Sequence, residues 1–85
     1  MLTANSASPA IPVGDVDTIL CVFSGTFDGA SAHVGISVDG EHWDSFFVTE
    51  QDDMKYIPWA PYICVCTDGG TGKTNIKALI ARRLK

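Results

Sequence analysis

Basic side chains are scarce in most of this 85-residue sequence. Residues 1–72 contain all ten carboxylates and a single base, Lys55, a net charge of −9. Residues 73–85 contain the other five bases, a net charge of +5, so the chain as a whole carries −4. Because the acidic body repels phosphate and the basic segment holds no aromatic residue, the sequence disfavours nucleic-acid binding. We expect the basic segment to face solvent or the acidic surface of another protein.

Long apolar runs are also missing. No stretch approaches the about 18 residues that a membrane-spanning helix needs, so no membrane association is predicted. Residues 1–15 lack Lys, Arg and a continuous apolar run, and we do not expect a signal peptide. With 46% apolar and 19% charged residues, the chain is predicted to be one globular domain. A domain this small buries only roughly 60–65% of its surface, which favours support from a partner subunit.

Cysteine and histidine are few and scattered. An odd count, Cys21, Cys64 and Cys66, argues against a closed disulfide framework. We expect these to be small buried residues in a reducing compartment. His33 and His42 lie in unrelated segments, so neither a metal site nor a nucleophile with its base is predicted. The sequence therefore predicts no enzyme, no cofactor and no small-molecule substrate.

Short apolar segments separated by glycine turns predict an all-β fold. In residues 30–38, apolar and small or polar residues alternate strictly, which predicts a strand with one face buried. The apolar positions are Ala30, Ala32, Val34, Ile36 and Val38. Asp28-Gly29, just before this segment, is typical of a tight hairpin turn. Residues 73–85 fit a strand or a helix, and we favour the strand because a turn after an apolar strand returns the chain antiparallel. We expect further strands at 16–23 (buried on both faces), 43–49, 54–57 and 62–66.

The predicted architecture is a small antiparallel β-sandwich or barrel of five to six short strands formed by residues 16–85. Residues 1–15, which contain Pro9 and Pro12, are predicted to be an extended N-terminal arm that frays or lies against another subunit. Gly69–Thr74 is similar to a phosphate-binding loop, but Thr67 replaces the first glycine and only eleven residues follow. A loose turn, expected over residues 67–72, is the better interpretation.

The order of turns resembles that of a known group. Phe23–Ala30 ends a strand in a Gly-Thr-Phe-x-Gly-Ala turn, and Val34–Gly40 closes the next strand with Ser-x-Asp-Gly, followed by Trp43. With the Pro-aromatic strand and Gly-Thr-Gly turn of residues 58–72, this pattern is similar to small β-sandwich virion proteins of tailed bacteriophages. The likeness covers about residues 20–74. The Ser-x-Asp-Gly-x-x-Trp segment also resembles the Asp-box hairpin of sialidases, which implies a turn and no activity.

The resemblance implies a structural virion protein made in the host cytoplasm. We expect a capsid cement (decoration) protein that bridges capsid subunits and stabilises the DNA-filled head. The implied partners are the major capsid protein and copies of the chain itself, with a trimer as the oligomer common among such proteins. The residues expected at the protein interface are Phe46 and Trp59 as apolar contacts and Arg82 and Arg83 as ionic contacts.

A carbohydrate-binding module of a phage tail or fibre is the alternative. It predicts that Trp43, Trp59 or Tyr62 forms an exposed platform beside Asp52 or Asp53, because aromatic rings with nearby carboxylates bind sugar rings. A nucleic-acid-binding accessory factor is a third hypothesis, which predicts an affinity that falls steeply with salt.

Overall fold

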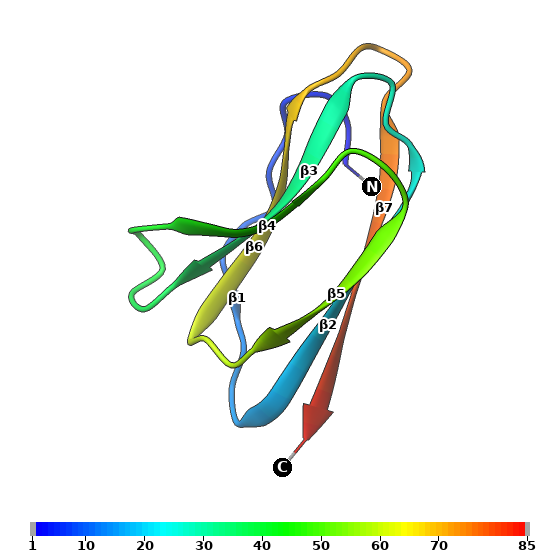
Figure 1. The fold of residues 1–85 in the computed structure, drawn as a ribbon. Coiled ribbons are helices and arrows are strands. Elements are labelled where there is room, and N and C mark those ends of the chain that lie inside the picture. The colour runs from blue at the N-terminus through cyan, green and yellow to red at the C-terminus, as the bar shows by residue number, and fades with distance from the viewer. Residues whose placement is uncertain (1, 85) are drawn as a thin grey trace.

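The computed structural model describes residues 2–84, and these form seven β-strands and no helix (Figure 1). The expected last strand is present, although Lys85 at its end and Met1 at the other terminus lie outside the described residues. Among residues 2–84, no helix is long and apolar enough to span a membrane. The strands are β1 (Ile11–Pro12), β2 (Val16–Thr26), β3 (Ala30–Ser37), β4 (Asp44–Thr49), β5 (Asp53–Pro58), β6 (Tyr62–Gly69) and β7 (Asn75–Leu84).

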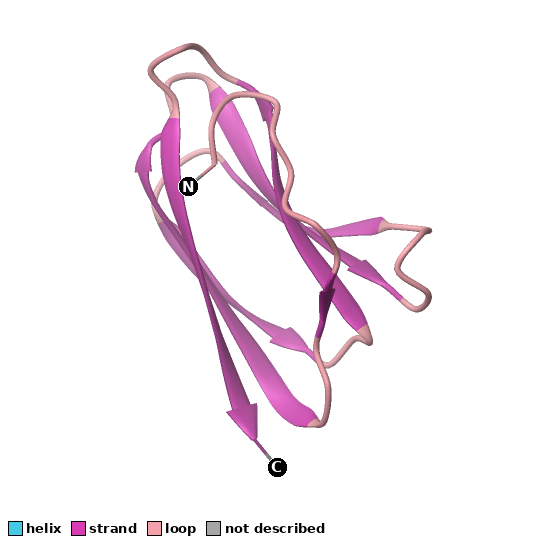
Figure 2. Cartoon of the chain, turned by 180° about the vertical axis from the view of Figure 1, so that it is seen from behind, coloured by secondary structure: helices cyan, strands magenta, loops and turns pink. Residues whose placement is uncertain are grey.

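The strands form two antiparallel sheets that pack as a sandwich (Figures 1 and 2). One sheet has four strands in the order β1-β6-β3-β4, and the other has three in the order β5-β2-β7. The all-β prediction is therefore confirmed. The seventh strand is β1, which lies within the segment predicted to be an arm.

The core lies between the two sheets and is built from alternate residues. In β2, the side chains of Ile19, Cys21 and Phe23 are buried, and the residues between them are only partly buried. The prediction that this strand is buried on both faces was wrong, because the outer side of its sheet has no covering layer among the described residues. Across the sandwich, Phe23 stacks on Phe47 of β4 with ring centroids 6.5 Å apart.

The turn at Asp28-Gly29 is tight, but it is not a hairpin. Asp28 and Gly29 both have positive φ, 46° and 88°, and the Ala30 N–H donates to the Phe27 carbonyl at 3.0 Å. The strands on either side of this turn, β2 and β3, belong to different sheets. The predicted turn conformation is therefore present, and it carries the chain from one layer to the other.

The inward positions of β3 reach the core as far as Ile36, and the irregularity in its pairing lies in β4, where Phe46 is an extra residue. The pairing of β3 with β4 shifts between Val34 and Gly35. Beyond that point the polar Ser37 is buried and Val38 is 79% exposed. The alternation predicted through Val38 therefore holds through Ile36, whereas Val38 lies beyond the end of β3 and faces solvent.

The N-terminal segment packs on its own domain, contrary to the prediction of an arm that frays or reaches another subunit. Leu2 exchanges backbone hydrogen bonds with Ile76 at 2.7 and 2.9 Å. Farther along, the Thr67 N–H donates to the Ser6 carbonyl at 2.8 Å, and β1 pairs with β6. Leu2 and Val13 are both buried in the core. The segment covers one edge of the four-stranded sheet, and apolar burial explains why it does not extend into solvent.

The glycine-rich segment joins β6 to β7. β6 continues through Gly69, so the turn begins later than predicted. The Thr74 N–H donates to the Thr71 carbonyl at 3.1 Å, and the buried Thr74 hydroxyl donates to the Phe27 carbonyl at 3.0 Å. A strand follows this turn where a phosphate-binding loop would open a helix.

Candidate binding surfaces

Two tryptophans from different loops line one hollow of about 520 Å³. Trp43 comes from the β3–β4 loop and Trp59 from the β5–β6 loop. The remaining walls are mainly apolar, and the polar atoms come from one buried hydroxyl, one imidazole and one carboxylate. The other lining residues are Ile36, Ser37, Val38, His42, Asp44, Ala60 and Pro61.

Both indoles are held in place by the backbone beside them. A Cβ added to Gly35 would lie 3.4 Å from Cε3 of Trp43 and 3.0 Å from Sγ of Cys64, so the ring occupies the space that a missing side chain leaves. The Trp59 Nε1–H donates to the Gly14 carbonyl at 2.6 Å, and about half of that side chain stays exposed. A ring fixed in this way loses little conformational entropy on binding a ligand.

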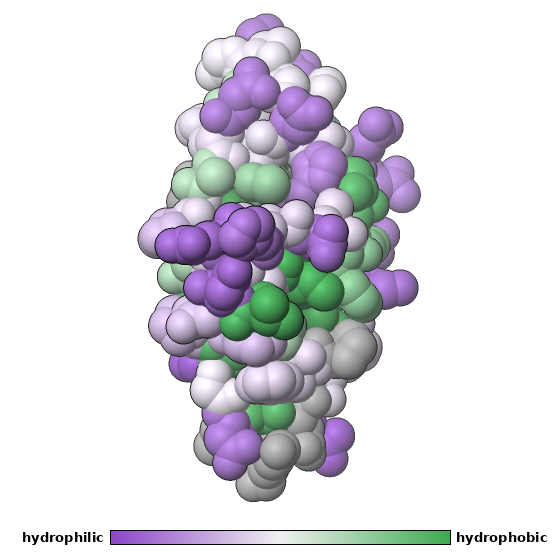
Figure 3. Space-filling model, turned by 90° about the vertical axis from the view of Figure 1, so that its left-hand side faces the viewer, coloured by the Kyte–Doolittle hydropathy of each residue, from purple (hydrophilic) through white to green (hydrophobic). Residues whose placement is uncertain are grey.

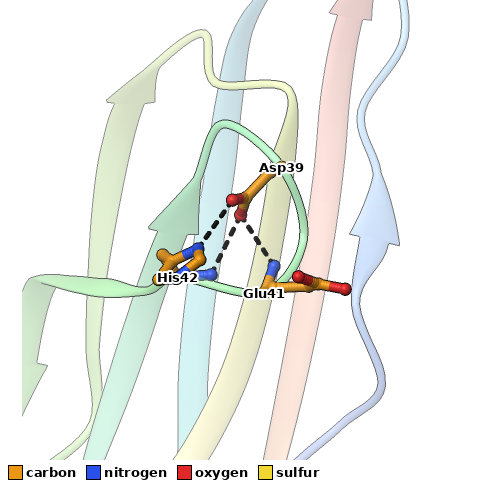
Figure 4. Close-up of side chains that lie close together, drawn as sticks. All are labelled: Asp39, Glu41 and His42. Atoms are coloured by element: carbon orange, nitrogen blue, oxygen red, sulfur yellow. Dashed lines mark hydrogen bonds and ion pairs between the residues drawn. The ribbon is translucent and has the colours of Figure 1, made fainter.

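The wall of the hollow beside Trp43 is set by the turn at Asp39 (Figure 4). Its carboxylate accepts the backbone N–H groups of Glu41 at 2.8 Å and His42 at 2.9 Å, and it pairs with Nδ1 of His42 at 2.7 Å. The backbone N–H groups of His42 and Glu41, and then the His42 ring, hold the pKa of Asp39 well below its usual range. Asp39, Glu41 and His42 are all exposed, and one possible metal-ligand atom from each lies within 4.8 Å of the others. The Asp39 oxygens, however, already accept hydrogen bonds within the turn.

The outer face of the three-stranded sheet is apolar at its centre. We call it the β2 face. In register, Leu20 lies between Tyr56 and Ala81, and the neighbouring row consists of Met54, Val22 and Leu79. Tyr56 is 65% exposed, and more than half of Met54 and Leu79 is exposed as well. An apolar patch made of two complete rows across a sheet is typical of an interaction surface.

The outer face of the four-stranded sheet, the β3 face, is also partly apolar. His33 lies between Cys66 of β6 and Val48 of β4. Farther along, the Trp43 ring lies against Gly35, and Phe46, the extra residue of β4, does not belong to the core cluster. Phe46 is 38% exposed and Val48 about half exposed. Seen from the side on which the β3–β4 loop projects, hydrophobic residues reach the surface next to hydrophilic ones (Figure 3).

The four residues predicted at the interface do not share one surface. Phe46 lies on the β3 face and Trp59 in the tryptophan hollow. Arg83 pairs with Thr18 on the β2 face, whereas Arg82 pairs with Ile19 in the inward row and donates to the Val13 carbonyl at 3.4 Å. Both arginines border a shallow hollow of about 430 Å³ beside Leu20 and Tyr56. All four are at least partly exposed; the two arginines share one hollow, and Trp59 lines a different one.

For the sugar-binding alternative, two of the three predicted aromatic residues, Trp43 and Trp59, come together, but the predicted carboxylates do not join them. Asp52 accepts the Gly25 N–H at 3.0 Å, and Asp53 pairs with Phe23 of β2. The carboxylate that lines the hollow is Asp44, the first residue of β4. The third predicted ring, Tyr62, is only partly exposed and packs under Gly40.

Sequence reasoning missed the β2 face, although its signal was present. Met54 and Tyr56 are two residues apart on β5, and Leu79 and Ala81 are two apart on β7, so each pair lies on one face of its strand. Only the pairing of both strands with β2 makes these pairs a continuous surface.

The cysteine thiols are poor nucleophiles. Burial raises the pKa of Cys21 to about 11, and burial is also the main cause that raises the pKa values of Cys64 and Cys66. Cys21 is buried as predicted, whereas Cys64 and Cys66 are only half-buried, on the β3 face. A protonated thiol neither attacks a substrate nor binds a metal efficiently.

Comparisons with protein-family models, with curated proteins and with solved structures found no match to this chain. The functional interpretation therefore depends on the surfaces described above.

Proposed function

We propose that this chain is a structural protein that bridges neighbouring subunits of a larger assembly, and that it acts as a cement protein on the surface of a phage capsid. The observation that carries the proposal is the pair of exposed apolar faces on opposite layers of one small sandwich. A protein with two such faces contacts two neighbours at once, which is the geometry a bridge requires. Major capsid protein and further copies of the chain are the proposed partners.

Two further properties support this proposal. The exposed side chains include tyrosine, tryptophan, methionine and arginine, which are enriched in protein interfaces. A domain of this size is also only marginally stable alone, and a lattice that binds only the folded form stabilises it by mass action. The phage assignment itself depends on the resemblance of the turns in residues 20–74 to small virion proteins.

The test uses particles that lack this protein. Heated or osmotically shocked particles without it are expected to release DNA at a lower temperature or a smaller shock than complete particles. Adding the wild-type protein back should restore retention, and adding a Tyr56→Asp, Phe46→Asp variant should not. Unchanged DNA retention in the particles without the protein would remove the cement function.

The tryptophan hollow favours a second candidate function, binding of a carbohydrate ring. Trp43 and Trp59 supply apolar surfaces for the ring, and Ser37, His42 and Asp44 supply polar atoms. This is the combination of groups that orients a sugar, and it fits a module of a phage tail or fibre.

A glycan array distinguishes the two candidates. The sugar-binding function predicts a signal that Trp43→Ala and Trp59→Ala each abolish, while Tyr56→Ala on the β2 face leaves it unchanged. An array without signal for the wild-type protein would eliminate this candidate and would not affect the bridging function.

A further inference from the structure

Charge is divided between the two layers of the sandwich. The strands of the four-stranded sheet contain no Lys or Arg, and they carry Asp44 and Asp68. The β3–β4 loop adds Asp39 and Glu41 to the same layer. The strands of the three-stranded sheet contain four of the six bases of the chain, Lys55, Lys77, Arg82 and Arg83, and two carboxylates, Asp17 and Asp53. Their net charge is therefore +2 (four minus two), against −2 for the strands of the four-stranded sheet.

The β2 face is therefore an apolar centre with a positive charge at each end. Lys77 pairs with Ser24 at one end of its rows, and Arg83 pairs with Thr18 at the other. Among the described side chains in the outward rows of β2, β5 and β7, none is a carboxylate. The β3 face has the opposite character, because its outward row beyond Cys66 ends in Asp68, which pairs with Ser31.

We propose that copies of this chain bind one another head to tail, with the β2 face of one copy against the β3 face of the next. The proposal deepens the bridging function by naming one partner and the two surfaces used. The apolar centres of the two faces cover each other, and the bases at the ends of the β2 face meet carboxylates of the β3 layer. Opposite charges at the rim of such an interface favour this pairing over others.

Pairing of identical faces is disfavoured by the same charges. When two β2 faces pair about a twofold axis, the positive charges of Lys77 and Arg83 on one copy face only the same positive charges on the other. Two β3 faces bring Asp68 and the acidic β3–β4 loops together. Like charges across an interface cost binding free energy, so the contact between different faces is preferred. A contact between different faces repeats, and it gives a closed ring or an open chain of copies.

The faces are large enough for such a contact. The molecule measures 38 × 23 × 16 Å, and a sandwich of two sheets about 10 Å apart is thinnest across its layers. The broad sides are therefore the two outer faces. Their extent matches the about 800 Å² that each partner contributes to a standard interface.

The experiment uses one variant blocked on each face and measures the size of the protein by sedimentation velocity. Leu79→Glu blocks the β2 face and Val48→Lys blocks the β3 face, and both positions are exposed, so the core is unchanged. The wild-type protein is expected to associate at tens of micromolar and to dissociate as salt rises. Each variant alone should be a monomer, and an equal mixture should form a one-to-one dimer, because each partner then retains one of the two complementary faces.

Circular dichroism of each variant checks the fold, and the charge-reversed Lys77→Glu, Arg83→Glu protein serves as an independent block of the β2 face. A variant that self-associates with one face blocked would overturn the proposal, and so would a mixture that stays monomeric. A wild-type protein that is monomeric at every concentration would also overturn it. That last result leaves the particle experiment unaffected, because a monomer can still bridge capsid subunits, and a failed particle experiment leaves the head-to-tail contact standing.

Discussion

At the scale of single residues, Asp39 links the stability of the β3–β4 turn to pH. Hydrogen bonds from the backbone N–H groups of His42 and Glu41 lower the pKa of Asp39 from its ordinary value of 3.8. The folded state therefore favours the ionised carboxylate. This contribution to stability is fully present above about pH 4 and is lost as the pH falls through the lowered pKa of the folded state.

We accordingly expect Asp39→Asn to reduce the acid sensitivity of folding. In urea unfolding curves measured from pH 5 to pH 2, the midpoint of the wild-type protein should fall more steeply than that of Asp39→Asn. Asp44→Asn, which removes a carboxylate from the same hairpin, is the matched control and should follow the wild-type protein. Parallel curves for the wild-type and Asp39→Asn proteins would contradict this assignment of the turn.

Two glycines with positive φ allow the cost of backbone strain to be measured separately from the cost of a steric clash. Gly25 in β2 has a φ of 129°, and an added Cβ would lie 2.4 Å from the Asn75 carbonyl oxygen of β7. Gly29 has a φ of 88° and no atom within 4 Å of the added Cβ. We expect Gly25→Ala to lower the free energy of unfolding by about 2–4 kcal/mol and Gly29→Ala by about 1 kcal/mol. Chemical denaturation checks both values, and equal losses would show that the close approach of β2 and β7 is not tight.

At the scale of elements, the N-terminal segment is part of the sandwich and should contribute to its stability. Leu2 is buried against the core and is hydrogen-bonded to Ile76. Leu2→Ala is therefore expected to cost about 2–5 kcal/mol, the range for truncating a buried leucine. Pro9→Ala, at an exposed position of the same segment, is the control and should cost far less. A Leu2→Ala protein with wild-type stability would mean that the segment does not pack on its own domain in solution.

The strands could be predicted from the sequence, whereas their distribution between two sheets could not. Short apolar segments between turns are a local signal, strictly alternating in residues 30–38, and they located the interior of each of the six predicted strands. Asp28-Gly29 specifies a tight turn equally well within a sheet and between sheets, so the crossing from β2 to β3 was not visible locally. The bulge of β4 at Phe46 depends on its pairing with β3, a strand separated from it by a loop, and was not visible in the sequence.

The candidate surfaces could be predicted only in part, because they too depend on the pairing of strands that are distant in the sequence. The apolar character and partial exposure of Phe46 and Trp59 follow from surplus aromatic residues that one core cannot enclose. The β2 face required the register of three strands from separate parts of the chain. The placement of Arg82 and Arg83 in different rows of β7 follows from strand geometry, once the segment is known to be a strand and not a helix, but the hollow that both side chains border does not.

At the scale of the whole molecule, small size limits how much apolar surface the chain buries by itself. The exposed surface of 5058 Å² is close to the roughly 4,900 Å² of a compact monomer of this mass, so burial within the chain is typical for its length. Part of the exposed apolar surface lies on the two outer faces, and Val38 and Trp59 add more of it in the loops. Under the proposed bridging function, covering those faces with another protein adds stability beyond that of the isolated small domain.

Thermal unfolding should therefore depend on protein concentration. Self-association stabilises only the folded form, and a partner at about 100 times its Kd contributes about 2.7 kcal/mol. For a domain of this size, that raises the Tm by on the order of 10 °C. We expect the Tm of the wild-type protein to rise with concentration at low salt and to lose this rise at high salt, where charge at the rim of the faces is screened. Leu79→Glu should have one Tm at all concentrations. If the wild-type Tm is equally constant, the exposed faces contribute nothing to the stability of the free protein, and any stabilisation must come from a different partner.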